Sequence, residues 1–372
     1  MSVNLSEATM PSTVSESDEI IRTSTVTRFV DRLLAEGEID PRLAVALRSV
    51  REAVQERNSD GPFLSVLLRT QGQRIEPFKD ALLCLAAQSS QDFEVIVIDH
   101  DADIAGAAAV REAIANQAES FRSRVRVLEV SGGNRGKPLN VGIKAARGQY
   151  VAVFDDDDLL FGNWVAEFKN VAATSQGRLL RSLVAVQTVL PETWRHREAG
   201  FRATSWPKAA YPRTFDQIAH FEVNYSPFMS WAFPSSVFGT YGLAFDEELT
   251  VCEDWDMILR GSTLCGVDQV DALTAVYRRW EGGVSSYTAH SRESWDWSEA
   301  RVVRKLNEST LLLAPGATVA IRSLLSDKGA RLELNYLANS SAWKLARPIR
   351  GAVRVARIAR RIAGKIARRV RR

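Results

Sequence analysis

Between residues 63 and 156, four short apolar runs rich in β-branched residues alternate with helix-like segments. The apolar runs occupy residues 63–70, 93–100, 125–131 and 150–156. Segments with helical spacing of apolar residues separate them, at 75–89, 103–121 and 138–147. Strands that alternate with helices predict an α/β fold, in which a parallel or mixed sheet is flanked by helices. Ligands of such sheets bind at the carboxyl ends of the strands.

Further elements are predicted on either side of this pattern. Residues 1–17 are rich in Ser, Thr and acidic residues, which is typical of a disordered leader. Residues 18–57 carry helix-spaced apolar positions with a break before Pro41, so a helical pair is expected there. Seven of the nine tryptophans lie between Trp194 and Trp297, which suggests a second half with its own surface.

Composition narrows the class of protein. With 372 residues, 45% hydrophobic and 25% charged, the chain is typical of soluble globular proteins. Its three cysteines are widely spaced and form neither a disulfide framework nor a metal knuckle, which favours a reducing compartment. No apolar run approaches the roughly 18 residues needed to span a bilayer, and the N-terminus does not resemble a signal peptide. A cytoplasmic protein is expected.

The C-terminal segment is strongly basic, whereas the rest of the chain is acidic. From Lys344 to Arg372 there are 12 Lys or Arg and no Asp or Glu; without them, 36 basic and 45 acidic residues leave a net charge of −9. Basic residues recur here every three or four positions, which predicts a basic amphipathic helix over 346–372. An anionic membrane surface is the favoured partner. An RNA-binding arm or a helix that docks on the acidic body are the alternatives.

Four consecutive aspartates, 155–158, follow the fourth predicted strand directly. In an extended chain Asp155 and Asp157 face the same side, and crowded carboxylates are unfavourable unless a cation neutralises them. Oxygen ligands of this kind select Mg²⁺ or Mn²⁺, so we predict a metal site, with a solvated acidic loop as the alternative. A second acidic group, Glu253, Asp254 and Asp256, lies where a helix is predicted to begin. There it can also serve only to complement the helix dipole.

The segment GNRGKPLNVGIKAARGQYVAVFDDDDLL resembles the centre of family 2 glycosyltransferases, which have the GT-A fold. The residues that fall on the family pattern are Asn140, Gly142, Ala146, Gly148, Asp155, Asp157 and Asp158. The resemblance implies that Asp155 and Asp157 hold Mn²⁺ or Mg²⁺ on the diphosphate of a nucleotide-sugar, with Asp158 as a third acidic candidate. Asn140 is expected among the donor-binding residues.

Two upstream segments are similar to the same family. SVLLRTQGQR resembles its first strand and loop, which implies a donor-binding role for Thr70, although Arg69, Gln71 and Gly72 replace its Pro, Tyr and Asn. VIVIDHDADI resembles its second strand, which implies that Asp99 contacts the base; a helix cap for 103–121 is the alternative. Lys137 is expected to face the diphosphate, or else to be solvated.

Downstream, AFDEELTVCEDWDMILR resembles the ED motif of this family, which implies that Asp254 is the general base. VYRRWEGGVSS resembles a further family segment, with Trp280 where some relatives have a metal-contacting His. Arg278 is expected either to reach a phosphate or to be solvated. Trp194, Trp206, Tyr225, Trp231 and Trp255 are expected in the core, with sugar stacking as the alternative.

The resemblance implies an inverting, metal-assisted glycosyltransferase at the inner face of the cell membrane. Its donor would be a UDP-, dTDP- or GDP-linked sugar and its acceptor a glycan or lipid-linked glycan in cell-surface polysaccharide or glycolipid synthesis; no nucleic acid is expected. A sugar-phosphate nucleotidyltransferase and a non-catalytic glycan-binding membrane adaptor are the alternatives. The predicted organisation is an N-terminal extension, nucleotide-sugar half, acceptor half, helical region and basic tail, at 1–60, 61–160, 161–290, 291–345 and 346–372.

Overall fold

The computed structural model describes residues 22–35, 39–55, 61–194, 197–282, 286–313 and 315–326. Of these, the residues up to 313 form one compact unit, and residues 315–326 belong to another, in which residues 317–326 are helical. The leader predicted over 1–17 and the tail predicted over 346–372 lie outside the described residues. The fold described below is that of the first unit.

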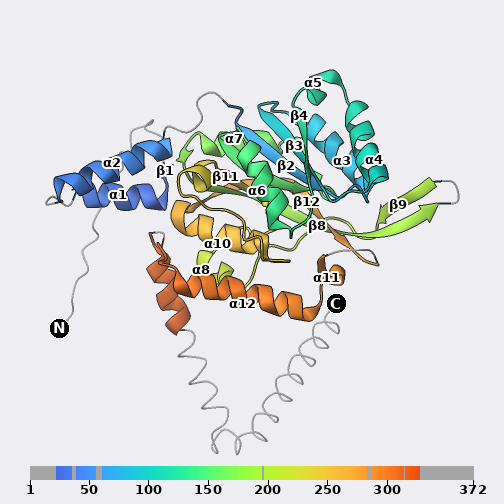
Figure 1. The fold of residues 1–372 in the computed structure, drawn as a ribbon. Coiled ribbons are helices and arrows are strands. Elements are labelled where there is room, and N and C mark those ends of the chain that lie inside the picture. The colour runs from blue at the N-terminus through green and yellow to red at the C-terminus, as the bar shows by residue number, and fades with distance from the viewer. Residues whose placement is uncertain are drawn as a thin grey trace, which may run out of the picture. The chain divides into compact units, whose positions relative to one another are not determined.

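A mixed sheet of ten strands forms the centre of this unit (Figure 1). Its first four strands are parallel, in the order β4-β3-β2-β5, and they coincide closely with the four predicted apolar runs. Their bounds are Leu64–Thr70 for β2, Phe93–His100 for β3, Val125–Val130 for β4 and Tyr150–Asp155 for β5. The predicted α/β class is confirmed in this half.

The second half of the chain continues the same sheet rather than forming a layer of its own. Beyond β5 the order is β11-β8-β12-β6, and β9 and β10 pair with β8. β11 is antiparallel to both β5 and β8, and β12 is parallel to β8. The bounds are Leu159–Leu160 (β6), Leu179–Trp194 (β8), Arg197–Ala203 (β9), Lys208–Ala209 (β10), Trp231–Pro234 (β11) and Val267–Trp280 (β12). A short parallel pair joins β1 (Arg22–Thr23) to β7 (Ser175–Gln176).

Helices cover both faces of the sheet (Figure 1). The longer ones are α1 (Thr25–Ala35), α2 (Pro41–Gln55), α3 (Ile75–Ala86), α4 (Ile104–Ala115), α6 (Gly136–Ala145), α7 (Trp164–Ala172), α10 (Glu253–Cys265) and α12 (Arg292–Glu308). Short turns complete the set: α5 (Glu119–Arg122), α8 (Gln217–His220), η1 (Phe228–Ser230), α9 (Ser236–Gly239) and α11 (Ser286–Ala289). In the described part of the chain, no helix has the length and apolar character required to cross a bilayer.

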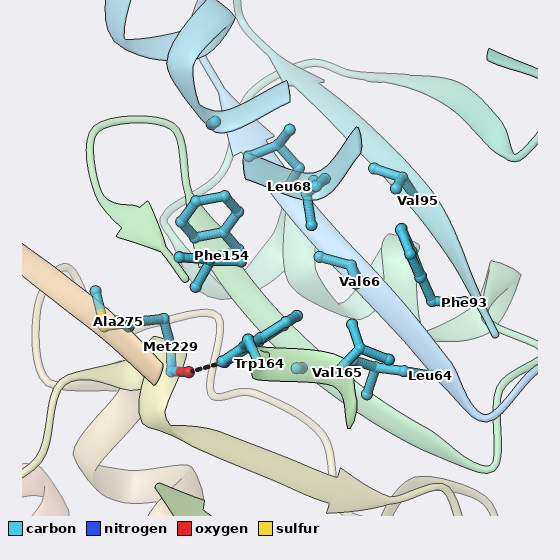
Figure 2. Packing of buried hydrophobic residues seen from close by; sticks show 14 of the residues in the cluster. Leu64, Val66, Leu68, Phe93, Val95, Phe154, Trp164, Val165, Met229 and Ala275 are labelled. Atoms are coloured by element: carbon cyan, nitrogen blue, oxygen red, sulfur yellow. Dashed lines mark hydrogen bonds between the residues drawn. The ribbon is translucent and has the colours of Figure 1, made fainter. Parts of the chain in front are cut away.

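Two apolar cores lie on opposite faces of the sheet because side chains alternate along each strand. On one face, Leu64, Val66 and Leu68 of β2 contact α3, α4 and α7, and Figure 2 shows them with Phe93, Phe154 and Trp164. The indole Nε1 of Trp164 donates to the Met229 carbonyl at 2.9 Å, so this buried polar group is satisfied. On the other face, Leu67 packs with α6 and α10.

Two glycines of the family-like segment are required by close packing. A Cβ on Gly142 of α6 would lie 2.6 Å from the Ile98 side chain, and one on Gly148 would lie 2.4 Å from the Ser65 backbone nitrogen. Such distances are too short for any larger residue, so both glycines let α6 and its loop approach the sheet closely. They allow α6 and the segment after it to lie close to β2 and β3.

Candidate active site

The carboxyl ends of β2, β3 and β5 bring several of the predicted residues together. Thr70 is aligned with Asp99 across β2 and β3, and Arg69 is aligned with Asp155 across β2 and β5. Parallel strands end at one edge of a sheet, so adjacent register positions place these side chains at one edge. Thr70 and Asp99 are both buried there.

The aspartate run forms a turn, which differs from the extended geometry that the sequence predicts. Asp155 ends β5, residues 156 and 157 are in a turn, and β6 begins at Leu159. Side-chain alternation therefore stops at Asp155. Asp156 points towards β2, where its Oδ2 accepts a hydrogen bond of 2.6 Å from the hydroxyl of Thr70.

Arginine side chains neutralise the turn from two sides. Arg69 Nη2 lies 2.9 Å from Oδ1 of Asp155. Arg74 bridges the next two carboxylates: its Nη2 lies 3.0 Å from Oδ1 of Asp156, and its Nη1 donates to Asp157. Crowded carboxylates are unfavourable without a positive charge beside them. In the described structure, the guanidinium groups of Arg69 and Arg74 supply that charge. In the sequence, Arg69 is only a departure from the family pattern, and Arg74 has no predicted role.

These contacts give the aspartates of the turn different pKa values. Burial acts to raise the pKa of Asp155, but Arg69 and Arg135 outweigh burial and hold the pKa below its ordinary value. Burial raises the pKa of Asp156 to about 7 and also raises that of Asp157, against the attraction of Arg74. Asp155 is therefore the residue of the turn that stays ionised most readily.

Asp158 has a different environment from its neighbours. Its Oδ1 accepts the backbone N–H of Arg278 on β12 at 2.8 Å, and the side chain is buried. Burial and the charge of Asp157 raise its pKa well above the ordinary value. This carboxyl group links the turn to β12, and one of its oxygens is occupied by that contact.

The second acidic group lies at the start of α10, as the sequence predicts, and next to the first. Cys252, with φ of 66°, precedes Glu253 and reverses the chain into the helix. The carboxylate of Glu253 is 2.6 Å from Nε of Arg135 and 3.4 Å from Nη1 of Arg69. Because Arg69 also binds Asp155, one guanidinium joins the two acidic segments that lie far apart in the sequence.

Asp254 follows Glu253 and is held by two hydrogen-bond donors. Its Oδ1 accepts the N–H of Trp255 at 2.7 Å, and its Oδ2 accepts the side-chain amide of Asn224 at 2.9 Å. Burial and the adjacent charge of Glu253 raise the pKa of Asp254 to about 6. A carboxylate with this pKa can accept a proton near neutral pH.

Asp256 has different partners from Glu253 and Asp254. It is buried and forms ion pairs with Arg260 of the same helix and with Lys305 of α12. The pair with Lys305 fixes α12 to α10, so the contacts of Asp256 stabilise the packing of these two helices.

Three other predicted donor-site residues have contacts of their own. Asp99 is buried at the end of β3, and burial raises its pKa. The helix-cap alternative for Asp99 is wrong, since Asp103 caps α4 by accepting the N–H of Gly106 at 2.7 Å. Lys137 Nζ donates to the Ser131 carbonyl at 2.7 Å, at an exposed position. The amide of Asn140 bonds the backbone N–H and C=O of Phe245, and thereby ties α6 to the segment before α10.

The aromatic residues predicted for the core differ in their exposure. Trp231 and Trp255 are buried, as expected for core residues, whereas Trp206 is 89% exposed. Trp280 lies beside the turn, because the Arg74 guanidinium is 5.9 Å from its ring centroid. Arg278 is buried rather than solvated: its Nη2 pairs with Asp80 at 2.9 Å and its Cζ lies 4.4 Å from the ring centroid of Phe201 on β9, whereas its Nε and Nη1 have no hydrogen-bond partner among the described residues.

The chemistry of the turn fits a divalent cation that arrives with a phosphate ligand. No group of three or more His, Cys, Asp or Glu among the described residues is arranged to hold a metal ion. Mg²⁺ is commonly bound by only one or two carboxylates together with substrate phosphates and water. Asp155 and Asp157 each give one oxygen to an arginine in the described structure, and the second oxygen of each suits such an ion.

An α/β sheet with two acidic segments at its carboxyl edge is the arrangement that the sequence resemblance leads one to expect. Residues 73–236 match the family described as glycosyl transferase family 2. This match confirms, over these residues, the resemblance that the sequence predicts, and with it the predicted enzyme class; the α/β sheet agrees with the predicted fold class. The matched range includes the aspartate turn and ends before Glu253 and Asp254. A search of curated protein sequences finds no match.

Two solved structures are similar to this chain at low sequence identity. S. aureus TarS in complex with UDP-GlcNAc is 18% identical, with 65% of this chain and 65% of that chain covered and a TM-score of 0.49. This chain thus spans less than two thirds of the length of that protein. The mannosyltransferase PcManGT from Pyrobaculum calidifontis, in complex with GDP-Man and Mn²⁺, is 13% identical, with 90% and 98% covered and a TM-score of 0.49.

Proposed function

We propose that the chain transfers a sugar, with inversion, from a nucleotide-sugar to a hydroxyl group of a glycan or lipid-linked acceptor. The observation that carries the proposal is the contact of Arg69 with both Asp155 and Glu253. It brings the carboxylate suited to a metal–diphosphate complex and the carboxylate suited to proton transfer, Asp254, to the same edge of the sheet. Neither acidic segment alone would favour this reaction.

Asp254 takes the proton in the proposed mechanism. The acceptor oxygen attacks the anomeric carbon as its O–H bond breaks, and Asp254 receives the proton. The bond between the anomeric carbon and the diphosphate oxygen breaks on the opposite side, and the nucleoside diphosphate leaves with the electron pair. Burial and Glu253, which set the pKa of Asp254 to about 6, prepare it for this role.

Asp155 and Asp157 are the proposed ligands of a Mg²⁺ or Mn²⁺ ion, which would offset the negative charge that develops on the diphosphate. Asp155 suits this role because Arg69 and Arg135 keep its carboxyl group ionised. Asp99, buried at the end of β3, is the proposed contact to the base of a UDP-, dTDP- or GDP-linked donor. Thr70 orients Asp156 and so supports the turn from within.

The proposed cellular role is synthesis of a surface polysaccharide or glycolipid at the inner face of the membrane. It rests on the basic segment from Lys344 to Arg372, whose charge and helical spacing suit an anionic lipid surface. That segment lies outside the described residues, so the sequence alone supports this part of the proposal.

A thermal-shift screen tests the donor and the ion together. UDP, dTDP, GDP and their common sugar derivatives are compared with and without Mn²⁺, because a ligand that binds the folded state raises the unfolding temperature. We expect one nucleotide series to stabilise the protein, and to do so more strongly with Mn²⁺. The Asp155→Asn/Asp157→Asn double variant should lose the Mn²⁺-dependent part. If no nucleotide stabilises the protein with or without Mn²⁺, the proposal is contradicted. In a separate activity assay, release of pyrophosphate would indicate a nucleotidyltransferase instead.

A further inference from the structure

The position of Arg74 differs from that of the other arginine at the aspartate turn. Arg69 is 11% exposed and is held on three sides, by Asp155, by Glu253 and by the backbone carbonyl of Arg135 at 3.2 Å. Arg74 is 38% exposed. It lies in the irregular segment between β2 and α3, and its hydrogen bonds in the described structure go to Asp156 and Asp157. Arg69 is thus a buried residue that links parts of the site, whereas Arg74 is a partly exposed counter-ion of the turn.

We propose that Arg74 is an exchangeable counter-ion of the donor site: it neutralises Asp156 and Asp157 in the ligand-free protein and turns to the diphosphate when donor and divalent cation bind. This inference rests on the proposed function and adds a donor-binding residue to it. It assigns a role to Arg74, the last residue of the family-like segment SVLLRTQGQR, for which the resemblance implied none.

Charge balance is the first argument for the exchange. Asp157 is a proposed metal ligand and is also the ion-pair partner of Arg74. The metal ion and the guanidinium are both positive, so they repel each other when both lie at this carboxylate. A divalent cation at Asp155 and Asp157 therefore replaces the charge that Arg74 supplies. The arriving diphosphate is negative and needs a cationic partner, which the released guanidinium provides.

The geometry of the guanidinium is the second argument. A planar fork of donors fits two phosphate oxygens as well as it fits two carboxylate oxygens, so exchange between the two does not require a new type of interaction. The ring of Trp280, with its centroid 5.9 Å from Cζ of Arg74, offers a face on which the guanidinium can rest between the two positions. The side chain then stays at the site while its partners change.

The inference predicts opposite effects on two affinities. In Arg74→Gln, Mn²⁺ no longer meets the positive charge of the guanidinium at Asp157, so binding of Mn²⁺ alone should tighten by roughly tenfold. The same change removes a charge-assisted contact to the diphosphate, so the nucleoside diphosphate preferred by the wild type should bind roughly tenfold more weakly at saturating Mn²⁺. Isothermal titration calorimetry measures both values. Arg74→Lys keeps the charge without the fork and should lie between the wild type and Arg74→Gln.

The matched control is Arg292→Gln, which removes an exposed guanidinium paired with Asp296 within α12 and should change neither affinity. The thermal unfolding midpoint of each variant checks that it is folded, and Arg74→Lys serves as the second variant if Arg74→Gln is not. Unchanged affinities in the Arg74 variants, or weaker Mn²⁺ binding in them, overturn the inference while the proposed function stands. A wild-type protein that binds no nucleoside diphosphate removes both.

Discussion

At the scale of single residues, the carboxylate of Asp254 carries the proposed proton transfer. Asp254→Asn keeps the shape of the side chain and its contact with the Trp255 N–H, but it removes the basic oxygen. We expect the rate of nucleoside diphosphate release with acceptor to fall by roughly 10²- to 10⁴-fold, while donor affinity changes little. Release assays and thermal shifts with donor measure the two quantities. A variant that turns over at a near-normal rate rules out Asp254 as the base.

The pH dependence of the reaction follows from the same side chain. The base works only when ionised, and its pKa is raised to about 6, so kcat/KM should rise with pH and level off above that value. The amide of Asn224 stabilises the ionised form; its loss in Asn224→Ala raises the pKa further and moves the acidic limb to higher pH. Profiles from pH 5 to 8 test this. Asn134→Ala, which removes an amide bound to the backbone of Glu247 and Glu248, should leave the limb in place.

The sequence predicted which residues meet at the site better than it predicted what each one contacts. The position of Asp155 followed from a strand end, and that of Asp254 from a helix start, because both are fixed by the local backbone. Asn140 did not follow, since its partner Phe245 is distant in sequence and only the folded chain brings it close. Arg69 and Arg74 were missed for a similar reason: long flexible side chains choose their partners in three dimensions.

At the scale of elements, Asp246 connects the segment before α10 to α12. It accepts hydrogen bonds from Arg301 at 2.8 Å and from Lys305 at 3.0 Å, and burial is outweighed so that its pKa falls to about 2. The folded-state pKa lies below the unfolded one, so this stability is present above about pH 4 and is lost as pH falls towards 2. Asp246→Asn should lower the free energy of unfolding by roughly 1 to 2 kcal/mol at pH 7.

Urea titrations at pH 7 and at pH 3 measure this difference, which should shrink at the lower pH. The matched control is Asp296→Asn in α12, whose exposed pair with Arg292 should contribute little. An equal loss in both variants, or a loss that grows on acidification, contradicts the assignment of Asp246.

The first four strands were predictable and the later ones were not, for a reason of pairing. β2, β3, β4 and β5 are separated by helices, so each is bounded by a change of period that the sequence displays. β8 is a single strand of 16 residues whose burial alternates irregularly, and it pairs with four other strands along its length. Its partners β11 and β12 lie far along the chain. The extent of the second half of the sheet is therefore set by long-range pairing.

At the scale of the whole molecule, charge is distributed unevenly along the chain. The segment from Lys344 to Arg372 carries 12 basic residues, and the remainder has a net charge of −9. An acidic body is repelled by an anionic bilayer, so membrane binding would depend on this segment alone. Each basic residue near such a surface contributes about 1 kcal/mol, which suffices for reversible attachment without a spanning helix.

Deletion of residues 345–372 should therefore abolish binding to vesicles that contain phosphatidylglycerol, as measured by co-sedimentation at low salt. Full-length protein should bind these vesicles, ignore vesicles of phosphatidylcholine alone, and dissociate as salt is raised, because the screening length falls to about 3 Å at 1 M. An unchanged nucleotide-induced thermal shift in the truncated protein serves as the control for the fold. Equal vesicle binding with and without the segment would place the membrane contact elsewhere. If the deletion removes only RNA binding, the segment is a nucleic-acid arm. If the deletion only lowers the unfolding temperature, the segment is a helix that docks on the acidic body.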